Sequence, residues 1–441
     1  MTWDLIDKFL SSSKITEMGE NMKAKKKAKL DLVGDDTLVV GIDVGKRNHY
    51  CRFINVRGYE IGKGFSFSNN RDGMEKIVSK IEEAKIQNNL GKAVIGMEPS
   101  GHYWKASAHY LSGSGYKLAL VNPYHIKRIK EIEDNSQTKT DPKDSLLIAK
   151  LVRDGDFFDP NLAGGIYAEL RRMYRLRLKV SKSLVQEKTK LKILLDEYFP
   201  EYEGLFCDIL GATSEYIIDN YFLPESIASE NILSLTGKIK MISRGKIGAS
   251  KVLKLIECAR ASIGINTGID AAVLEKTYIL KDISDLKLKL AYLNKKLKCY
   301  LEKIECSKYL LSIPGVGVVT AAGFLGEVGD ISKYKSAKEI IKLAGLNLVE
   351  ISSGIKKGKK KISKRGNNRL RCLLYQCAVV AISKNSQLKR YYCYQAEAKN
   401  KMKMVVAVQC KLTRIMFALL KYKKYYDPEE VLKSMVAQEV A

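Results

Sequence analysis

The stretch TLVVGIDVGK at residues 37–46 is an apolar run that ends in a turn, a pattern typical of a buried β-strand. Residues 48–56 and 60–68 follow it with alternating polar and apolar side chains, which predicts two more strands in a meander. The turn between these two strands falls at Arg57-Gly58. The sequence therefore predicts that a sheet begins near residue 37.

Strands and helices alternate in the next part of the chain. Residues 70–87 and 140–155 have helical patterns, whereas KAVIGMEPSG (92–101) and YKLALVNP (116–123) are typical of buried strands. Strands that first follow one another and then alternate with helices indicate a mixed sheet covered by helices. We therefore expect an α/β domain over residues 37–160.

The pattern changes to long helices after residue 161. Residues 166–197 carry an apolar helical stripe. Residues 279–304 carry nearly four heptads, with apolar positions at Ile279, Ile283, Leu286, Leu290, Leu293, Leu297, Leu301 and Ile304. The two helices could pair with each other or with another protomer, and we prefer the second interpretation, a self-association arm.

Residues 306–425 form a third segment, which we expect to be mainly α-helical. Its SIPGVG stretch predicts two short helices around a hairpin, in which Gly315 and Gly317 let backbone N–H groups approach a phosphate. An ordinary glycine-rich helix connection explains the same residues. The remaining segments are a basic leader at 1–36, expected to be mobile, the helical region at 161–305 and a tail at 426–441.

The composition indicates a polyanionic partner. The 441 residues include 76 Lys and Arg against 49 Asp and Glu, a net charge of +27. Such a surplus favours phosphates, which release counterions when cations bind. A basic soluble protein without such a partner is the alternative. No apolar run approaches the length of a membrane span, and the nine cysteines, without a C-x-x-C pair, fit a reducing cytoplasm.

Four acids lie where a sheet can bring side chains together. Asp43 lies in the first predicted strand, Glu98 ends a later one, and Asp141 and Asp144 stand three apart at a helix start. Such positions can converge at one edge of a sheet, and carboxylate oxygens are the ligands that Mg²⁺ or Mn²⁺ prefers. The sequence therefore predicts a metal site at which a metal pair assists attack on a phosphodiester.

Helix capping explains part of this set without a metal. Asp141 precedes Pro142 and suits an N-cap, and Asp144 suits the first turn because a helix N-terminus favours negative charge. Glu98 could be a polar strand end. Asp43 is harder to explain in this way, because an acid inside an apolar strand is costly to bury without a partner.

Two serines precede a glycine in GLNLVEISSG, residues 345–354, and a run of cations follows them. The cations are Lys356, Lys357, Lys359, Lys360, Lys361, Lys364, Arg365, Arg369 and Arg371. We expect them to bind nucleic acid by holding phosphates and offsetting negative charge. In the alternative interpretation the serines are turn residues that bond to their own backbone, and the cations form a solvated loop.

Seven motifs, in this order, resemble those of the DEDD transposases of bacterial insertion sequences, which are bridge-RNA-guided serine recombinases. The motifs are GIDVGK, GMEPSGHYW, VNPYHIKRIK, KTDPKDSLLIAK, SIPGVGVVTA, LAGLNLVEISSG and ISKRGNNRLRCLL. The resemblance covers residues 37–160 and 306–425. It implies an RuvC-like (RNase H-type) α/β domain, a helical coiled-coil arm and a mainly α-helical C-terminal transposase domain.

The resemblance also implies roles for individual residues. The residues that would hold Mg²⁺ are Asp43, Glu98, Asp141 and Asp144. Ser353, directly before the glycine, would be the catalytic serine, with Ser352 as the less favoured alternative. A serine that attacks phosphorus keeps the bond energy in a phosphoserine linkage, which a DNA 3′-hydroxyl can reverse, whereas attack by water discards it.

The partners that the resemblance implies are donor and target DNA and a structured non-coding guide RNA. Family members act as dimers that pair into tetramers, with the carboxylates of one protomer beside the serine of another. Three features depart from the family pattern: Leu348, where proline is frequent, the leader, and an insertion at 198–270.

Two other functions stay open from the sequence. A junction-resolving nuclease would use the four acids with water, leave free 5′-phosphate ends and not need Ser353. A non-catalytic scaffold would bind nucleic acid through the basic residues and would be unaffected by Asp43→Asn.

Overall fold

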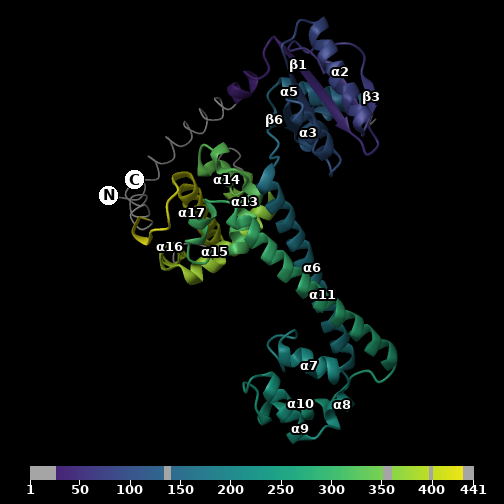
Figure 1. Cartoon of the computed structure of the whole chain (residues 1–441), viewed down its shortest axis with the longest axis vertical. Coiled ribbons are helices and arrows are strands. Elements are labelled where there is room, and N and C mark those ends of the chain that lie inside the picture. Colours follow the sequence, from purple (N-terminus) through teal and green to yellow (C-terminus); the bar gives the residue numbers. More distant parts are fainter. Residues whose placement is uncertain (1–25, 134–140, 351–359, 397–400, 431–441) are drawn as a thin grey trace, which may run out of the picture. The chain divides into compact units, whose positions relative to one another are not determined.

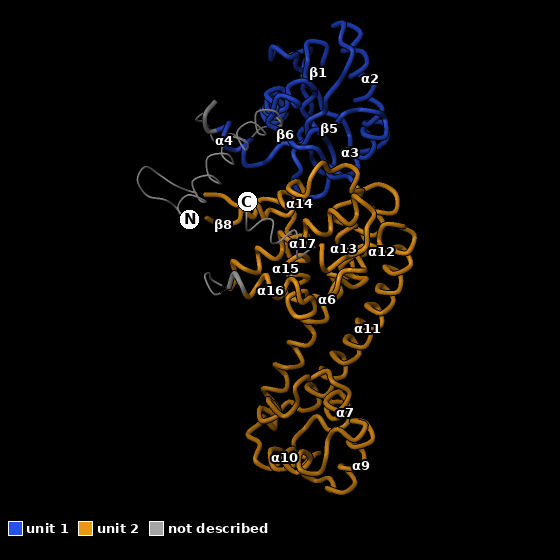
Figure 2. The backbone as a smooth tube through the Cα atoms, turned by 90° about the vertical axis from the view of Figure 1, so that its left-hand side faces the viewer, with its two compact units in different colours: residues 1–162 blue, residues 163–441 orange. Residues whose placement is uncertain are grey.

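The computed structural model describes residues 26–133, 141–350, 360–396 and 401–430. The chain forms two compact units, Met1–Leu162 and Ala163–Ala441, which Figure 2 draws in separate colours. The first unit contains the six-stranded sheet, and the second is built mainly from helices.

Six strands form the sheet of the first unit. They are β1 (Thr37–Val44), β2 (Asn48–Ile54), β3 (Phe65–Ser68), β4 (Lys92–Met97), β5 (Lys117–Val121) and β6 (Phe157–Phe158), in the order β3-β2-β1-β4-β5-β6. β1 pairs parallel with β4, and β4 with β5, while the other pairs are antiparallel. The sheet is therefore mixed, which confirms the predicted α/β class.

Helices cover both faces of this sheet (Figure 1). They are α2 (Arg71–Gln87), α3 (Trp104–Gly113), α4 (Pro123–Glu133) and α5 (Asp141–Arg153). Successive strand residues point to opposite faces, and along β1 Val40 and Ile42 pack with α2 and α3, whereas Val39 packs with α4 and α5. The odd-numbered positions of β1, among them Asp43, therefore belong to the face that α5 covers.

α5 lies very close to the sheet at two glycines. Gly41 and Gly96 are register partners on β1 and β4. A Cβ atom on Gly41 would lie 2.0 Å from the backbone oxygen of Ser145, and one on Gly96 would lie 2.6 Å from Cγ2 of Val152. Glycine alone allows this approach at Gly41, so the absence of a side chain sets the height of α5 above the end of β1.

We expect Gly41→Ala to destabilise the first unit by about 2 kcal/mol or more, because overpacking a core costs ~1–3 kcal/mol and the obstacle here is backbone. Urea unfolding followed by the fluorescence of Trp104, in a Trp3→Phe background, measures this. Gly113→Ala is the control, because nothing lies within 4 Å of a Cβ atom at that position. Equal stability of the two variants would contradict the role given to Gly41.

Part of the expected leader is folded onto the first unit. Residues 26–30 are helical, and Val33 is buried in the core that α4 and α5 form with the sheet. Lys29 lies over the ring of Phe157, 5.0 Å from its centroid. The first unit therefore begins upstream of residue 37, unlike the boundary drawn from the sequence. The short stretch LDLV after the basic run is a weak signal of burial, and of its three apolar side chains only Val33 is buried while Leu30 and Leu32 are exposed.

The second unit contains a stem of two long helices, α6 (Gly165–Tyr198) and α11 (Ile269–Glu302), which lie side by side (Figure 1). They are antiparallel, because Leu170 shares a core with Leu301, while Leu195 shares another with Ile279. Of the two pairings that the heptad pattern allows, the structure shows the one within the chain.

Four short helices pack on one end of the stem. They are α7 (Ala212–Asn220), α8 (Pro224–Ala228), α9 (Ile232–Ile242) and α10 (Ala249–Arg260). Their apolar side chains, such as Ile218, Leu235 and Leu255, share a core with Leu194 of α6 and Ile283 of α11. We call residues 199–268 the cap; it is most of the insertion noted in the sequence.

The other end of the stem packs in a helical bundle around buried residues such as Phe324, Leu374 and Met416. Its elements are α12 (Ser307–Leu311), α13 (Val318–Val328), α14 (Ala337–Leu343), β7 (Leu348–Val349), β8 (Lys361–Ile362), α15 (Asn368–Lys384), α16 (Ser386–Ala396) and α17 (Lys401–Tyr422). The C-terminal part is mainly α-helical, as predicted. Among the described helices, none combines the length and apolar character that crossing a membrane requires.

Candidate active site and nucleic-acid interface

Asp43 and Glu98 come at the carboxyl ends of two neighbouring parallel strands, β1 and β4. The last register partners of β1 and β4 are Ile42 and Met97, and Asp43 and Glu98 are the residues that follow these two along the chain. Both acids are half-buried. Asp43 belongs to the positions of β1 on the face of the sheet that α5 covers. Ser100 donates from Oγ to Oε1 of Glu98 at 2.5 Å, which holds this carboxylate at the strand end.

Asp144 approaches the same face from the first turn of α5. It directly precedes Ser145, whose backbone oxygen lies against Gly41, and it is only 3% exposed. Its Oδ1 forms an ion pair with Nζ of Lys130, which comes from α4. Asp141 is the first residue of α5, but its side chain is not among those that the structure describes.

The chemistry of these donors fits a divalent metal. Asp43, Glu98 and Asp144 offer hard oxygen ligands on one face of the sheet, the kind that Mg²⁺ and Mn²⁺ prefer. Among the described side chains, no group of three or more acids, histidines or cysteines is close enough to hold one ion. The ammonium group of Lys130 instead compensates the charge of Asp144. The metal role of the four acids therefore stays a prediction.

The serine motif is bracketed by two short strands. β7 and β8 pair antiparallel, with Leu348 opposite Ile362 and Val349 opposite Lys361. Ser352 and Ser353 belong to the chain between them and lie outside the described residues, as do Lys356, Lys357 and Lys359. The roles predicted for these residues are untested by the structure.

The described cations of the basic segment differ in what they contact. Lys361, Lys364 and Arg369 are exposed, as is Arg365, while Lys360 lies 3.7 Å from a carboxylate oxygen of Glu350. These positions are compatible with phosphate binding.

Arg371 has a structural role that the sequence analysis did not expect. Its Nη1 donates to the backbone oxygens of Ala344 and Lys364, at 2.9 and 3.2 Å, and its Nη2 donates to Oδ1 of Asn368 at 2.9 Å. The half-buried guanidinium of Arg371 therefore connects Ala344, which precedes the serine motif, to Lys364 and Asn368, which follow it. The nucleic-acid contact predicted for Arg371 remains untested beside this role.

The two glycines of the predicted hairpin lie between α12 and α13. Gly315 has a positive φ of 92°, and a Cβ atom there would lie 3.3 Å from Cα of Ala381, so the turn and its packing on α15 require glycine. Gly317 precedes α13, and nothing lies within 4 Å of a Cβ atom at that position. Of the two, Gly317 is therefore the one that leaves backbone open to another molecule.

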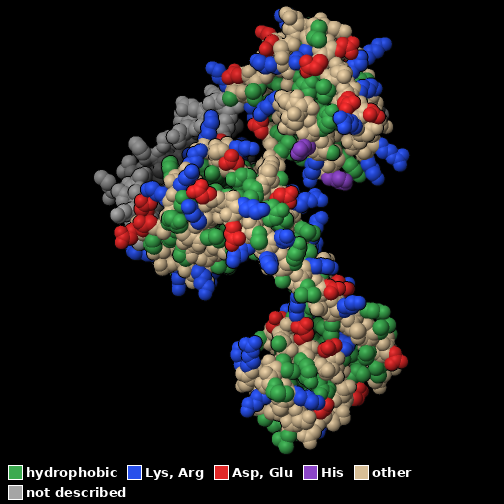
Figure 3. All heavy atoms as spheres, viewed as in Figure 1, with side chains coloured by type: hydrophobic (Ala, Val, Ile, Leu, Met, Phe, Trp, Pro, Cys, Tyr) green, Lys and Arg blue, Asp and Glu red, His purple; other side chains and the backbone are tan. Residues whose placement is uncertain are grey.

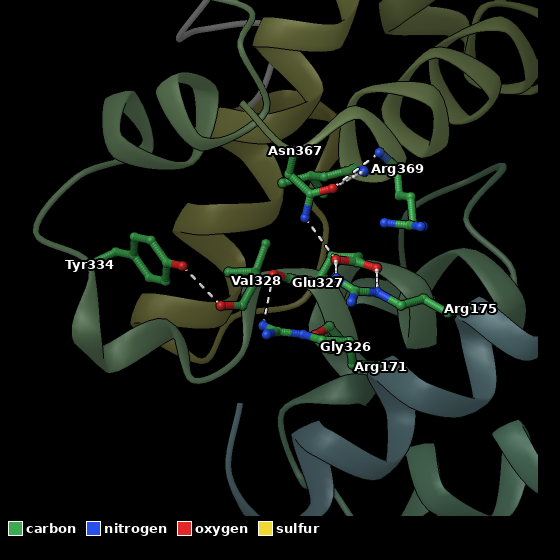
Figure 4. A network of polar contacts seen from close by, with 9 residues as sticks. Arg171, Arg175, Gly326, Glu327, Val328, Tyr334, Asn367 and Arg369 are labelled. Atoms are coloured by element: carbon green, nitrogen blue, oxygen red, sulfur yellow. Dashed lines mark hydrogen bonds and ion pairs between the residues drawn. The ribbon is translucent and has the colours of Figure 1, made fainter. Parts of the chain in front are cut away.

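A buried acid that the sequence analysis missed lies in α13. Glu327 is fully buried and accepts two hydrogen bonds of 2.7 Å from Arg175 of the stem, Nε to Oε1 and Nη2 to Oε2 (Figure 4). Asn367 donates from Nδ2 to Oε2 of Glu327 at 2.7 Å. Arg171 donates to the backbone oxygens of Gly326 and Glu327. One carboxylate therefore connects the stem, α13 and the start of α15.

This network fixes Asn367, the residue directly before α15. Asn367 caps α15, because its Oδ1 accepts hydrogen bonds from the backbone N–H groups of Arg369 and Leu370, at 3.0 and 3.2 Å. Glu327 accepts a hydrogen bond from Nδ2 of the same side chain, so it holds Asn367 in place as the N-cap residue of α15.

Glu327 is held ionised. Burial raises its pKa, but hydrogen bonds from Arg175 and Asn367 and the charges of Arg175 and Arg171 outweigh this and hold the pKa below the ordinary glutamate value. The hydrogen bond to Glu327 in turn raises the pKa of Arg175. The resulting stabilisation is present above the ordinary glutamate pKa and is lost as the pH falls through the lowered one.

We expect Glu327→Gln to lower the free energy of unfolding of the second unit by about 3 kcal/mol at pH 7, because it leaves Arg175 without its counter-charge. The difference from wild type should shrink as the pH falls through the lowered pKa of Glu327, where the wild-type carboxylate takes up a proton. Urea unfolding followed by circular dichroism measures this. Glu305→Gln is the control, because Glu305 forms an exposed pair with Lys308; an equal loss in both variants would contradict the account.

Two family models match the chain. The model of the IS110-type DEDD transposases, described as "Transposase", matches residues 40–200, and that described as "Transposase IS116/IS110/IS902 family" matches residues 307–393. The first match includes the predicted acids of the sheet domain as well as Arg171 and Arg175, and the second includes the serine motif, Glu327 and Asn367.

Relatives match along most of the chain. An insertion element IS116 protein of Streptomyces clavuligerus, named "uncharacterized 44.8 kDa protein", is 25% identical over 89% of this chain and 97% of its own length. A pilin gene-inverting protein of Moraxella bovis is 22% identical over 88% of this chain and 97% of its own. A transposase for insertion sequence element IS1328 of Yersinia enterocolitica is 39% identical over 20% of this chain and 26% of its own.

Proposed function

We propose, since this chain belongs to the IS110 family of DEDD transposases, that it cuts and rejoins DNA through a phosphoserine intermediate. The family establishes the enzyme class: the protein is a transposase, an enzyme that acts on DNA. The proposal adds the nucleophile, the metal ion and the guide that selects the DNA.

One observation carries the proposal. Asp43 and Glu98 follow the last register partners of β1 and β4, Ile42 and Met97, and Asp144 directly precedes Ser145, whose backbone oxygen lies against Gly41 of β1. Asp141 begins α5, the helix that contains Asp144. We propose that these four acids hold Mg²⁺, or Mn²⁺, consistent with the divalent metal that the family implies. Such an ion, when bound, favours deprotonation of the attacking hydroxyl and stabilises negative charge on the phosphate.

Ser353 is the nucleophile in this proposal. Its Oγ forms a bond to the phosphorus of the phosphodiester, the bond from phosphorus to the 3′-oxygen breaks, and the serine proton passes to the leaving 3′-oxygen. The DNA is then held as a 5′-phosphoserine, and the 3′-hydroxyl of another strand reverses the step to rejoin the DNA. The exposed cations Lys361, Lys364 and Arg369 hold phosphates beside it.

The name of one relative supports rejoining as well as cutting. A pilin gene-inverting protein, as its name states, inverts a gene, and inversion requires that both cut ends be joined to new partners. A nuclease that uses water releases its ends, so it would account for the cutting step alone.

The DNA is selected, we propose, by a structured non-coding RNA that pairs with donor and target strands. The net charge of +27 supports binding of several nucleic-acid strands together. We further propose that the chain forms dimers that assemble into tetramers, so that the serine of one protomer meets the carboxylates of another.

A reconstituted strand-exchange reaction tests this function. Purified protein, the non-coding RNA transcribed from the flank of its own gene, and labelled donor and target DNA are mixed with Mg²⁺. We expect recombined junctions that disappear with EDTA, and a change in the pairing segment of the RNA should move the junction to the complementary target. Junctions whose position ignores the RNA would contradict the guide, and nicks without junctions would contradict the recombinase.

A further inference from the structure

The cap has a strongly divided charge. Residues 199–230 contain seven acids and no Lys or Arg, whereas residues 231–268 contain seven Lys or Arg and one acid, Glu257. The first half contains α7 and α8, and the second contains α9 and α10. The two halves therefore present different surfaces to a partner.

Four of the seven acids in the first half form ion pairs with lysines of the stem. Lys192 of α6 lies 2.6 Å from Glu203, and Lys287 of α11 lies 2.6 Å from Glu215. Lys188 and Lys276 form further pairs of the same kind with Asp208 and Asp219. These contacts attach the acidic half to the stem.

Most cations of the second half are exposed, and Lys238 is the one with an ion-pair partner in the described part of the chain. Lys238 lies 3.5 Å from Glu230. Lys240, Arg244, Lys246 and Lys254 are exposed, and within the described part of the chain none of them forms an ion pair. A concentration of uncompensated cations on one small surface is unfavourable by self-repulsion, and a polyanion relieves it.

The backbone of this surface is also open to close approach. Arg244 and Gly245 have positive φ, 51° and 76°, and turn the chain sharply between α9 and α10. Gly237 lies inside α9, where glycine is less favourable than alanine, yet among the described residues no atom outside its own helix backbone lies within 4 Å of a Cβ atom there. Packing within the protein therefore gives no reason for a glycine at this position.

The exposed side of α9 combines apolar and basic side chains. Leu235 and Ile239 face the core, which leaves Leu233 and Met241 on the outside, 83% and 77% exposed. Figure 3 shows the cap as the lowest lobe of its view, with Lys and Arg side chains beside exposed hydrophobic ones on the visible face. Cations bind phosphates, while apolar side chains beside them can pack against sugars and groove walls of a duplex.

We propose that α9, the turn 243–248 and α10 form a helix-turn-helix surface that binds the phosphate backbone of duplex DNA without reading its sequence. It rests on the proposed function for the choice of DNA as the partner, but not on the serine or the metal. Through this surface the cap would bind DNA at one end of the stem. This site is separate from the serine motif and its cations, which belong to the C-terminal bundle at the other end.

Fluorescence anisotropy of a labelled 30-base-pair duplex of arbitrary sequence, in EDTA and at several KCl concentrations, tests the proposal on the full chain. The test variant carries Lys240→Gln, Arg244→Gln, Lys246→Gln and Lys254→Gln. We expect at least about a tenfold weaker affinity near 0.1 M salt, and a salt slope reduced by up to about 3.6, because each of the four lost phosphate contacts removes about 0.9 from the slope. Because no cleavage is measured, a failure of the serine chemistry does not affect this result.

The control removes four charges from exposed lysines of α11 instead: Lys281, Lys289, Lys295 and Lys296, each changed to Gln. It should retain most of the affinity and the salt slope. If both variants lost the same DNA affinity, the lower net charge alone would explain the loss, and the proposal would be overturned. A loss of affinity for a matched RNA duplex, with DNA binding unchanged, would overturn the choice of DNA.

Gly237→Leu tests the geometry without changing a charge. We expect it to raise the thermal stability of the cap, because leucine favours a helix over glycine, and to weaken DNA binding several-fold by filling the open surface. Unchanged DNA binding in a stably folded Gly237→Leu protein would contradict the proposed contact along α9. A triple Lys→Arg variant at residues 240, 246 and 254 should bind like the wild type.

Discussion

The Asp43→Asn protein is expected to cleave DNA at least about a thousandfold more slowly than the wild type, because metal-assisted charge stabilisation contributes several kcal/mol and each 1.36 kcal/mol is tenfold in rate. The change removes one negative charge near the end of β1 and keeps the size of the side chain. The measurement is the single-turnover rate of strand cleavage with Mg²⁺ and the guide RNA.

Asp36→Asn is the matched control for this prediction. It makes the same change just before the opposite end of the strand, where Asp36 forms an exposed ion pair with Lys92 at 3.3 Å. Exposed pairs contribute at most about 1 kcal/mol to stability, so we expect the wild-type cleavage rate. If Asp43→Asn and Asp36→Asn cleaved equally fast, the acids would be structural, and a nucleic-acid scaffold would explain the protein better.

The Ser353→Ala protein is expected to form no covalent adduct with DNA and no rejoined product. The reason is that the proposed linkage is to Oγ of this residue, and alanine has no nucleophile to replace it. Reactions stopped with denaturant and resolved on a denaturing gel detect the adduct as DNA that migrates with the protein.

Ser352→Ala provides the control in the same motif. It removes a neighbouring hydroxyl and leaves the proposed nucleophile, so we expect the adduct to form. An adduct lost in Ser352→Ala and kept in Ser353→Ala would move the nucleophile by one residue. Nicked DNA with free 5′-phosphates, unaffected by either change, would support the water-using nuclease.

Much of the first unit could be predicted from local patterns. The apolar run around Asp43, the alternation that follows it and the break at Pro99 are signals within a few residues of one another. These signals predict where the strands lie, and the predicted strands in turn give the positions of Asp43 and Glu98. The close approach of α5 to Gly41 was not predictable, because it depends on Ser145, more than a hundred positions away.

The polar network of the second unit lies beyond such reasoning for the same physical reason. Glu327 appears in the sequence as one acid in a glycine-rich helix, and its partner Arg175 stands 152 positions upstream in a helix rich in cations. Neither carries a local mark of burial. A single acid within the apolar stretch VVTAAGFLGEVG was the one signal that could have identified it.

The same limit applies to the basic residues and to the heptads. Lys361 and Arg371 look alike in a run of cations, yet one is exposed and the other is bonded to three acceptors. The heptad positions of α11 predicted a helix with one apolar side, but not which helix covers that side. Composition and periodicity describe a single helix, whereas the packing of that helix depends on the sequence of a second helix as well.

Mass spectrometry of the trapped adduct determines whether Ser353 becomes covalently joined to DNA. Wild-type protein, guide RNA, donor and target DNA and Mg²⁺ are mixed, denatured, and digested with nuclease and protease. We predict a peptide that carries a nucleotide on Ser353, and no such peptide from Asp43→Asn protein. DNA cleaved at the wild-type rate without any nucleotide-bearing peptide would contradict the account.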